Sequence, residues 1–331
     1  MKKLIQILTT ALIGYLIYFF LLTTPSQTVE TKPLVIEKGQ GVQKIAELLK
    51  TAGFIKSKFG FETLVWFKGA SDQLQAGEYK LPTKLSLNQL VDYLAKGIGA
   101  MAERELKIIE GWTIIDIDEY LFKEGVAKKD EFIQAVGPNY QLPITNYQFF
   151  TDKPKKKGLE GYLFPDTYQV YKNATVEDIA RKMLENFDKK LTAEMRVDIE
   201  SRGRTVFDIV RMASIIEAEV PHVEDRPIIS GLLWKRLEVG MLLQVDSTLN
   251  YATGNKSRAL SFEELKIDSL YNSYKYPGLP PTPIGNPGLD AIKAAIYPKE
   301  SPYWFFLSSK DGKTIFSKTL EEHNAAKAKY L

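Results

Sequence analysis

Cysteine is absent from the 331-residue chain, and histidine occurs only twice, as His222 and His323. A chain without cysteine has no thiolate nucleophile, no disulfide and no cysteine metal ligand. Two histidines exclude a metal site built from several imidazoles, and a serine–histidine–aspartate triad would have to use one of them. We therefore predict no metal and no cofactor, and we expect any chemistry to rest largely on carboxyl groups.

A large excess of charge is also missing. The chain has 44 Lys and Arg against 41 Asp and Glu, which leaves a formal net charge of +3. This near balance argues against a nucleic-acid-binding protein with a broad basic surface. Apolar residues make up 44% and charged residues 26% of the chain, which is ordinary for a globular protein. The length suits about two domains of ~150 residues each.

A long uncharged run opens the chain. Lys2 and Lys3 precede an uncharged stretch from Leu4 to Leu22, close to the ~20 residues that span a bilayer as a helix. The positive flank predicts a cytoplasmic N-terminus with the bulk of the chain outside. A cleaved signal peptide is the competing interpretation, but the run is long for one and has no small-residue cleavage site. We expect an anchor over 1–23, a linker over 24–33, and a single-pass protein of the cell (inner) membrane with its bulk on the periplasmic side.

Three strand–turn–helix patterns follow the linker. Strands are expected at 34–36, at 79–81 and near 106–110, each followed by a turn with Gly or Pro and by an amphipathic helix. The first and third patterns resemble the opening of LysM-type modules, small α/β folds that bind glycans containing N-acetylglucosamine. A purely structural α/β module is the alternative. We assign residues 34–150 to this N-terminal α/β region.

Residues 151–331 form the second predicted region, after an irregular stretch over 140–175. Its amphipathic patterns predict successive helices in VEDIARKMLENFDKKL, in TVFDIVRMASIIEAEV and in DRPIISGLLWKRLEVG, the last ended by Gly240. Alternating apolar residues around Asp311 and Gly312 predict a hairpin. The expected fold class is α+β, with an N-terminal transmembrane helix, a LysM-like α/β module and a C-terminal mixed α+β catalytic domain.

Glu217 is the residue that the helical pattern sets apart. At about 100° per residue it falls inside an apolar stripe, whereas Glu219 and Asp208 point towards expected solvent. Apolar neighbours raise the pKa of a carboxyl group, and a retained proton can be given to a leaving oxygen, as glycosidic cleavage requires. The alternative is a buried ion pair, with Arg211 or Arg226 as the partner. The stripe consists of Val206, Val210, Ala213 and Val220.

Three polar and aromatic clusters accompany this helix, in GLEGYLFPDTYQV, LLQVDSTLNYATG and YNSY ahead of GLPP. Amides, hydroxyls, carboxyls and aromatic rings are the groups that line carbohydrate grooves, although the same residue types are common in turns. The candidate substrate-binding or supporting residues are Glu160, Tyr162, Asp166, Gln244, Asp246, Ser247, Thr248, Tyr271, Asn272 and Tyr274.

Six ordered motifs resemble those of the endolytic murein transglycosylase family, the MltG or YceG-like proteins: EGYLFPDTY, ASIIEAE, LQVDST, YNSY, GLPPTPIGNPG and EHN. The resemblance runs from about residue 106 to the C-terminus, with a weaker match over 34–105. It implies that Glu217 is the catalytic acid/base and that Glu219 supports the site. Ser247 stands where the family usually has Pro. Thr282 stands where it usually has Gly, and would strain a groove loop if that Gly has a positive φ.

The resemblance also implies a reaction. A membrane-anchored lytic transglycosylase would cleave the bond between N-acetylmuramic acid and N-acetylglucosamine within peptidoglycan strands. The substrate's own 6-hydroxyl attacks, so one glutamate suffices and a 1,6-anhydro end is left. The implied partners are peptidoglycan strands, the membrane and cell-wall synthesis or division proteins. A non-catalytic peptidoglycan-binding or scaffold protein and a lysozyme-like hydrolase remain as alternatives.

Overall fold

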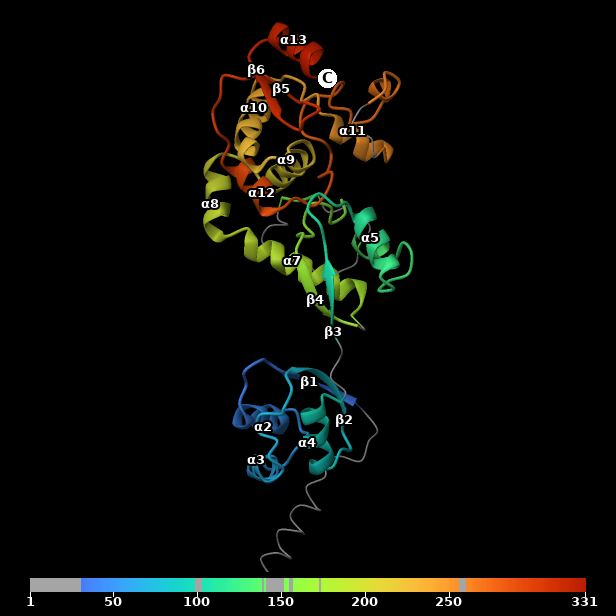
Figure 1. Cartoon of the computed structure of the whole chain (residues 1–331), viewed down its shortest axis with the longest axis vertical. Helices are drawn as coiled ribbons and strands as arrows, with labels where there is room; N and C mark the ends of the chain where they lie inside the picture. The colour runs from blue at the N-terminus through green and yellow to red at the C-terminus, as the bar shows by residue number, and fades with distance from the viewer. Residues whose placement is uncertain are drawn as a thin grey trace, which may run out of the picture. The chain divides into compact units, whose positions relative to one another are not determined.

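The computed structural model describes residues 31–98, 103–138, 140, 152–154, 157–172, 174–255 and 260–331. The expected anchor lies outside the described residues. Residues 31–33, assigned above to the linker, instead begin the first strand. None of the helices among the described residues has both the length and the apolar character needed to cross a bilayer. The chain divides into two compact units between Glu103 and Arg104 (Figure 1).

Unit 1 is built on an antiparallel strand pair with two helices between the strands. The order is β1 (Thr31–Ile36), α2 (Val42–Thr51), α3 (Lys58–Phe67), β2 (Gly77–Pro82) and α4 (Leu87–Lys96). Leu34 pairs with Tyr79 across the two strands, and the inward side chains of both meet the apolar faces of the helices. Their core includes Ile36, Ile45, Leu49, Phe61, Leu81, Leu90 and Leu94. The first two predicted strand–turn–helix patterns are therefore confirmed.

The third pattern belongs to unit 2, so the domain boundary expected at 150 lies too far along the chain. β3 (Glu103–Lys107) pairs with β4 (Thr167–Tyr171), far beyond the third helix. Leu106 and Ile117 are fully buried in the large core of unit 2. The local pattern repeats along the chain, but the apolar face of the third copy is covered by different elements.

Unit 2 is mostly helical. The first helices along its chain are α5 (Ile114–Lys123), α6 (Glu131–Val136), α7 (Val176–Lys190), α8 (Ala193–Ser201) and α9 (Val206–Glu219). The elements that follow α9 are η2 (Val223–Asp225), α10 (Arg226–Glu238), α11 (Asp246–Thr253), η3 (Glu264–Lys266), α12 (Leu289–Ile296), β5 (Phe305–Ser308), β6 (Thr314–Ser317) and α13 (Leu320–Tyr330). The two strands β5 and β6 form the predicted antiparallel hairpin, with Gly312 in its turn at φ 84°. The mixed α+β class is thus confirmed.

Helix α9 lies at the centre of unit 2, where α8, α10, α11 and α12 pack around it (Figure 1). Its buried residues point in every direction, and they are Phe207, Ile209, Val210, Met212, Ala213, Ser214, Ile215 and Ile216. A helix covered all round is a core helix and not an amphipathic surface helix. The single apolar stripe expected from the sequence is therefore wrong for α9.

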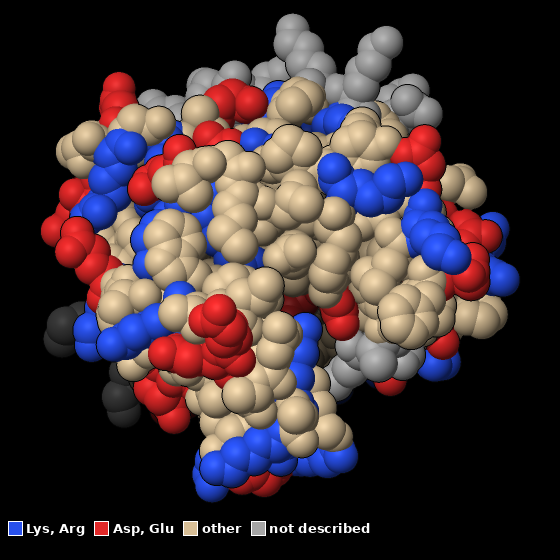
Figure 2. Space-filling model, turned by 90° about the horizontal axis from the view of Figure 1, so that it is seen from above, with Lys and Arg blue, Asp and Glu red and all other residues tan. Residues whose placement is uncertain are grey.

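Charges of both signs are intermixed on the face shown in Figure 2, around a mostly uncharged centre. This distribution is what the near balance of acidic and basic residues predicts. On that face no continuous basic field of the kind that binds a phosphate backbone is visible.

Candidate active site

Glu217 sits in the last turn of α9, where the chain is forced out of the helix. Val220 has φ −122° and ψ 96°, an extended conformation that the following Pro221 favours. Pro221 thus fixes both the end of α9 and the place of Glu217, four residues before the proline. The side chain of Glu217 is 7% exposed.

The carboxyl group of Glu217 is held by an ion pair. Arg226, the first residue of α10, donates to it from both terminal nitrogens, at 2.6 and 3.3 Å. Arg226 is itself buried, and its Nε donates to the carbonyl of Val220 at 3.1 Å. The sequence left open whether Glu217 has apolar neighbours or an arginine partner, and the structure has the arginine. The expectation of a carboxyl group surrounded only by apolar side chains is therefore wrong.

A third donor reaches Glu217 from α12. The N–H of Gly288, the residue that caps this helix, donates to Oε2 at 3.0 Å. The N-terminal end of a helix favours a negative group through its unpaired N–H groups. A Cβ at Gly111 would lie 3.6 Å from Cγ of Glu217, so the turn after β3 also packs against this side chain. Glu217 is thus enclosed by α9, α10, α12 and that turn.

Glu110 is a second carboxyl group beside Glu217, and no sequence pattern singled it out. Its carboxyl end fills the space beside Gly288, where a Cβ would lie 2.0 Å from Oε1 of Glu110. Burial of this end raises the pKa of Glu110. Glu217 and Asp290 act in the same direction, and Arg226 opposes them.

Glu160 is a third carboxyl group of this region and is 6% exposed. It accepts from the N–H of Ile114, at the start of α5, at 3.1 and 3.2 Å. The side chains of Asn286 and Tyr251 donate to it at 3.0 and 3.3 Å. Burial raises the pKa of Glu160 to about 8, although its hydrogen bonds act in the opposite direction. Of the two roles expected for Glu160, these contacts fit support of the fold.

Asn286 connects Glu160 to the region around Glu217. Its Nδ2 donates to Glu160 and to the carbonyl of Trp112, and its Oδ1 accepts from the N–H groups of Gly161 and Leu163. The side chain is fully buried, and Gly288 follows two residues later. One short segment therefore holds two of the carboxyl groups. Asn286 lies in the motif GLPPTPIGNPG, where no role was expected for it; its place between Gly285 and Pro287 was the available signal.

Glu219 does not point to solvent, contrary to the helical-wheel expectation. It is half-buried, and the N–H of Ser247 donates to its Oε1 at 2.9 Å. Burial raises the pKa of Glu219, against the hydrogen bonds from Ser247. A proline in place of Ser247 would have no N–H to donate, so this bond depends on the residue where the chain departs from the family pattern.

The segments around 244 and 273 pair with one another beside Glu219. The N–H of Gln244 donates to the carbonyl of Ser273 at 3.1 Å, and the hydroxyl of Tyr274 donates to Asp246 at 2.5 Å. Gln244 has φ 53° and an exposed side chain, a conformation that is uncommon outside glycine and is found at functional sites. Thr248 is fully buried, and its hydroxyl donates to the carbonyl of Val245 at 3.1 Å.

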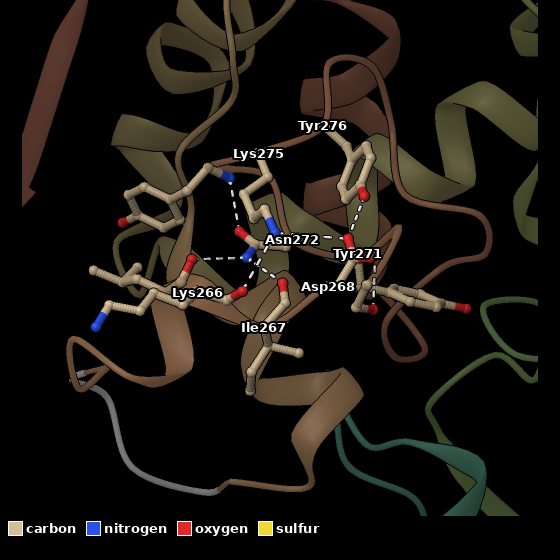
Figure 3. A network of polar contacts seen from close by, with 10 residues as sticks. Lys266, Ile267, Asp268, Tyr271, Asn272, Lys275 and Tyr276 are labelled. Carbon is tan, nitrogen blue, oxygen red and sulfur yellow. Dashed lines mark hydrogen bonds and ion pairs between the residues drawn. The ribbon is translucent and has the colours of Figure 1, made fainter.

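Asn272 and Tyr162 are core residues. The amide of Asn272 is fully buried and donates to the carbonyls of Leu265 and Ile267, at 3.0 and 2.8 Å (Figure 3). Tyr162 is fully buried against Phe187, with ring centroids 5.3 Å apart. Both side chains are fully enclosed by protein, and these contacts fit the supporting role expected for Asn272 and Tyr162.

The other candidates lie at the surface or in the aromatic cluster beside Glu160. Asp166 is exposed and accepts from Asn186 at 2.9 Å. Tyr271 shares a 2.6 Å hydrogen bond with Thr282, and its ring lies 5.4 Å from that of Tyr251. Thr282 is not among the described residues with positive φ, so the strain considered for this position is absent. None of the hydrogen bonds described for Gln244, Asp246, Tyr271 and Asn272 reaches Glu217. Asp246 instead lies near Glu219, and Tyr271 lies near Glu160.

The two histidines do not join the carboxyl groups. His222 Nε2 pairs with the carbonyl of Gly312 in the hairpin turn at 2.8 Å. His323 stacks on Phe305 with ring centroids 5.2 Å apart. Among the described residues there is no group of three or more His, Asp or Glu side chains placed to hold a metal ion.

Curated relatives bear on the class of enzyme. The chain is 35% identical over 306 residues to the endolytic murein transglycosylase of Bacillus subtilis (strain 168), covering 89% of this chain and 84% of the relative. It is 31% identical to the endolytic murein transglycosylase of Streptococcus pneumoniae serotype 2 over 89% of this chain and 58% of that longer relative. With these relatives and its buried carboxyl groups, the chain is an enzyme of the lytic transglycosylase class.

The family follows from two further matches. The model of the YceG-like family matches residues 34–329. The crystal structure of a yceG-like protein from Listeria monocytogenes has a TM-score of 0.60 and 32% identity, covering 90% of this chain and 99% of that chain. The chain belongs to the YceG-like family, as its motifs indicate.

Proposed function

We propose that this protein cleaves the glycosidic bond between N-acetylmuramic acid and N-acetylglucosamine within peptidoglycan strands and leaves 1,6-anhydro ends, with Glu217 as its catalytic carboxyl group. The observation that carries the proposal is the position of Glu217 at the end of a buried helix, where groups from three other elements contact it. The murein transglycosylase names of its relatives support the substrate class.

The reaction needs two proton transfers. The glycosidic oxygen takes a proton as its bond to C1 of N-acetylmuramic acid breaks, and the 6-hydroxyl loses a proton as its oxygen bonds to C1. In the simplest mechanism, the one that the resemblance implies, Glu217 carries out both transfers. The ion pair with Arg226 suits the second transfer, because a guanidinium has only donors and holds a group that accepts.

The first transfer requires a change at Glu217 when substrate binds. Hydrogen bonds at catalytic groups are often rearranged between the free enzyme and the complex. Exchange of the Arg226 contact for a sugar oxygen would let the carboxyl group take up a proton. The simplest mechanism thus includes a movement of Arg226.

The experiment is Glu217→Gln in the full chain, solubilised in detergent and incubated with purified glycan strands. We expect cleavage to fall by about 10²- to 10⁴-fold, the range for removal of a general acid/base, with thermal unfolding preserved. Mass spectrometry of the wild-type products should show anhydro ends. Glu200→Gln, an exposed glutamate of α8, is the matched control and should keep full activity. Near-normal cleavage by the Glu217 variant would reject the assignment, and reducing ends would indicate the lysozyme-like alternative.

We also propose that residues 1–23 anchor the protein in the cell membrane, with the bulk of the chain on the periplasmic side. The uncharged run from Leu4 to Leu22 after Lys2 and Lys3 supports this location. The full chain should stay with membranes in high salt and be released by detergent, whereas a chain starting at residue 24 should be released in buffer. Release of the full chain by salt alone would contradict an anchor.

A further inference from the structure

A second carboxyl group, that of Glu110, lies near Glu217, and a mechanism with a single glutamate does not use it. Glu110 lies in the turn between β3 and α5, directly before the Gly111 that packs against Glu217. Its carboxyl group occupies the side-chain space of Gly288, where even a Cβ would lie 2.0 Å from Oε1 and 2.3 Å from Cδ. A residue larger than glycine at 288 would expel it.

Gly288 contacts both Glu110 and Glu217. Its N–H donates to Oε2 of Glu217 at 3.0 Å, and its Cα faces the carboxyl group of Glu110. With standard backbone bond lengths, these contacts keep the nearest carboxyl oxygens within about 8 Å of one another. Pairs of carboxyl groups that act on the two sides of a glycosidic bond lie ~5–9.5 Å apart.

The two carboxyl groups differ in exposure and in partners. Glu217 is 7% exposed and bonded to Arg226, whereas Glu110 is an exposed residue. The charged groups facing Glu110 are Glu217 from α9, Arg226 from α10 and Asp290 from α12. Glu217 and Asp290 carry the same charge as an ionised Glu110, and like charges at close range favour retention of a proton. Burial and these two like charges raise the pKa of Glu110, and Arg226, which is bonded to Glu217, opposes them.

We propose that Glu110 is the general acid of the reaction and that Glu217 is its general base. This inference rests on the proposed function and divides between two residues the roles that the simplest mechanism gives to one. The raised pKa of Glu110 agrees with it. No movement of Arg226 is then needed, since Glu217 acts as a proton acceptor while its donors stay in place.

The proton and electron balance closes without a co-reactant. The Glu110 proton goes to the glycosidic oxygen, which keeps the electron pair of the breaking C1–O bond. The 6-hydroxyl oxygen forms the new bond to C1, and its proton goes to Glu217. After release of the products, Glu217 loses this proton to solvent and the exposed Glu110 takes one up.

The test compares Glu110→Gln with Glu217→Gln in the full chain on two substrates. One is the natural glycan strand, and the other is an aryl glycoside of N-acetylmuramic acid, whose leaving group departs without a general acid. We expect Glu110→Gln to lower kcat by about 10²- to 10⁴-fold on strands, to lose the fall in rate at high pH and to stay within about threefold of wild type on the aryl glycoside. Glu217→Gln should be inactive on both.

Two further variants keep the test decisive. Gly288→Ala fits the backbone, because φ is −75° there, and it keeps the N–H that binds Glu217 while displacing Glu110. It should show the same selective loss on strands. Glu105→Gln, five residues before Glu110 and exposed, is the matched control and should be unaffected.

Equal losses on both substrates, or unchanged activity and an unchanged pH profile in Glu110→Gln, would overturn the assignment of the acid. Activity in Glu217→Gln would instead reject the proposed catalytic residue. Wild-type chain that cleaves neither substrate would reject the proposed function as a whole. The three failures are therefore distinguishable.

Discussion

Unit 1 and unit 2 bury different kinds of side chain. Among the described residues of unit 1, Thr83 is the one buried polar residue, and the rest of its core is apolar. Unit 2 buries Asp118, Glu160, Arg226, Arg236, Asn272, Asn286 and other polar residues. Burial of a polar group is costly unless it is hydrogen-bonded, and such groups concentrate at functional sites. The comparison assigns the chemistry to unit 2.

The surfaces of the units also differ. Helix α3 of unit 1 exposes three large aromatic side chains, Phe59, Trp66 and Phe67, at 73, 77 and 79% of their full areas. Their exposure adds nothing to the core of unit 1. In unit 2 the aromatic residues nearest the carboxyl groups, Tyr251 and Tyr271, are instead partly covered and hydrogen-bonded. Unit 1 thus combines an almost wholly apolar core with exposed aromatic side chains on α3, whereas unit 2 buries polar groups in its core.

The largest expected effect is a loss of stability in unit 1 that leaves unit 2 unchanged. Leu49 of α2 is fully buried, and Leu49→Ala should cost about 2–5 kcal/mol in unit 1 alone. Hydrogen exchange resolved by residue should show faster opening over 31–98 and unchanged protection in α9. Val35→Ala, at a half-exposed position of β1, is the control. Equal loss of protection in both units would break the division into two units.

A pH effect should appear in unit 2 only. Burial raises the pKa of Glu160 to about 8 from a usual 4.5, so the folded protein binds a proton that the unfolded chain has lost. The stability of unit 2 should therefore fall as pH rises from about 4.5 to about 8, by up to ~1.4 kcal/mol per pH unit. Denaturant unfolding at several pH values measures this slope.

Glu160→Gln supplies the control for the pH effect. Glutamine does not titrate, so the slope contributed by Glu160 should vanish in this variant. Unit 1 should show no comparable slope, since Thr83, the polar residue it buries, does not titrate in this range. A slope of opposite sign in the wild type would show that Glu160 is ionised in the folded state.

The smallest effect is expected on α3. Trp66→Ser and Phe67→Ser remove side chains that are mostly exposed, and surface changes usually stay within about 0.5 kcal/mol. Neither stability nor kcat on soluble glycan strands should change. Phe61→Ser, in the same helix but fully buried, should unfold unit 1. A large loss of stability in Trp66→Ser would show that the exposed aromatic surface is part of a core.

Local patterns were predictable because they depend on neighbours in the chain. Helix α7 was predicted from its apolar periodicity, and Thr175 and Asp178 at its start form a capping box. The hairpin was predicted from its Asp–Gly turn and alternating strands. The boundary between the units was not predictable in this way, since it depends on which distant strand pairs with β3.

For the candidate site, too, the local features were predictable from the sequence and the contacts between distant segments were not. Sequence by itself determined that no cysteine chemistry is available, that Glu217 lies at the end of a largely apolar helix and that the motifs are those of the YceG-like family. Tertiary structure decided what surrounds that helix end. Arg226, Gly288 and Glu110 come from three other elements, and a helical period describes one element only. The protonation of a carboxyl group depends on the charges that lie near it in space. Those charges come from distant parts of the chain, so the partner of Glu217 and the position of Glu110 were visible only in the tertiary structure.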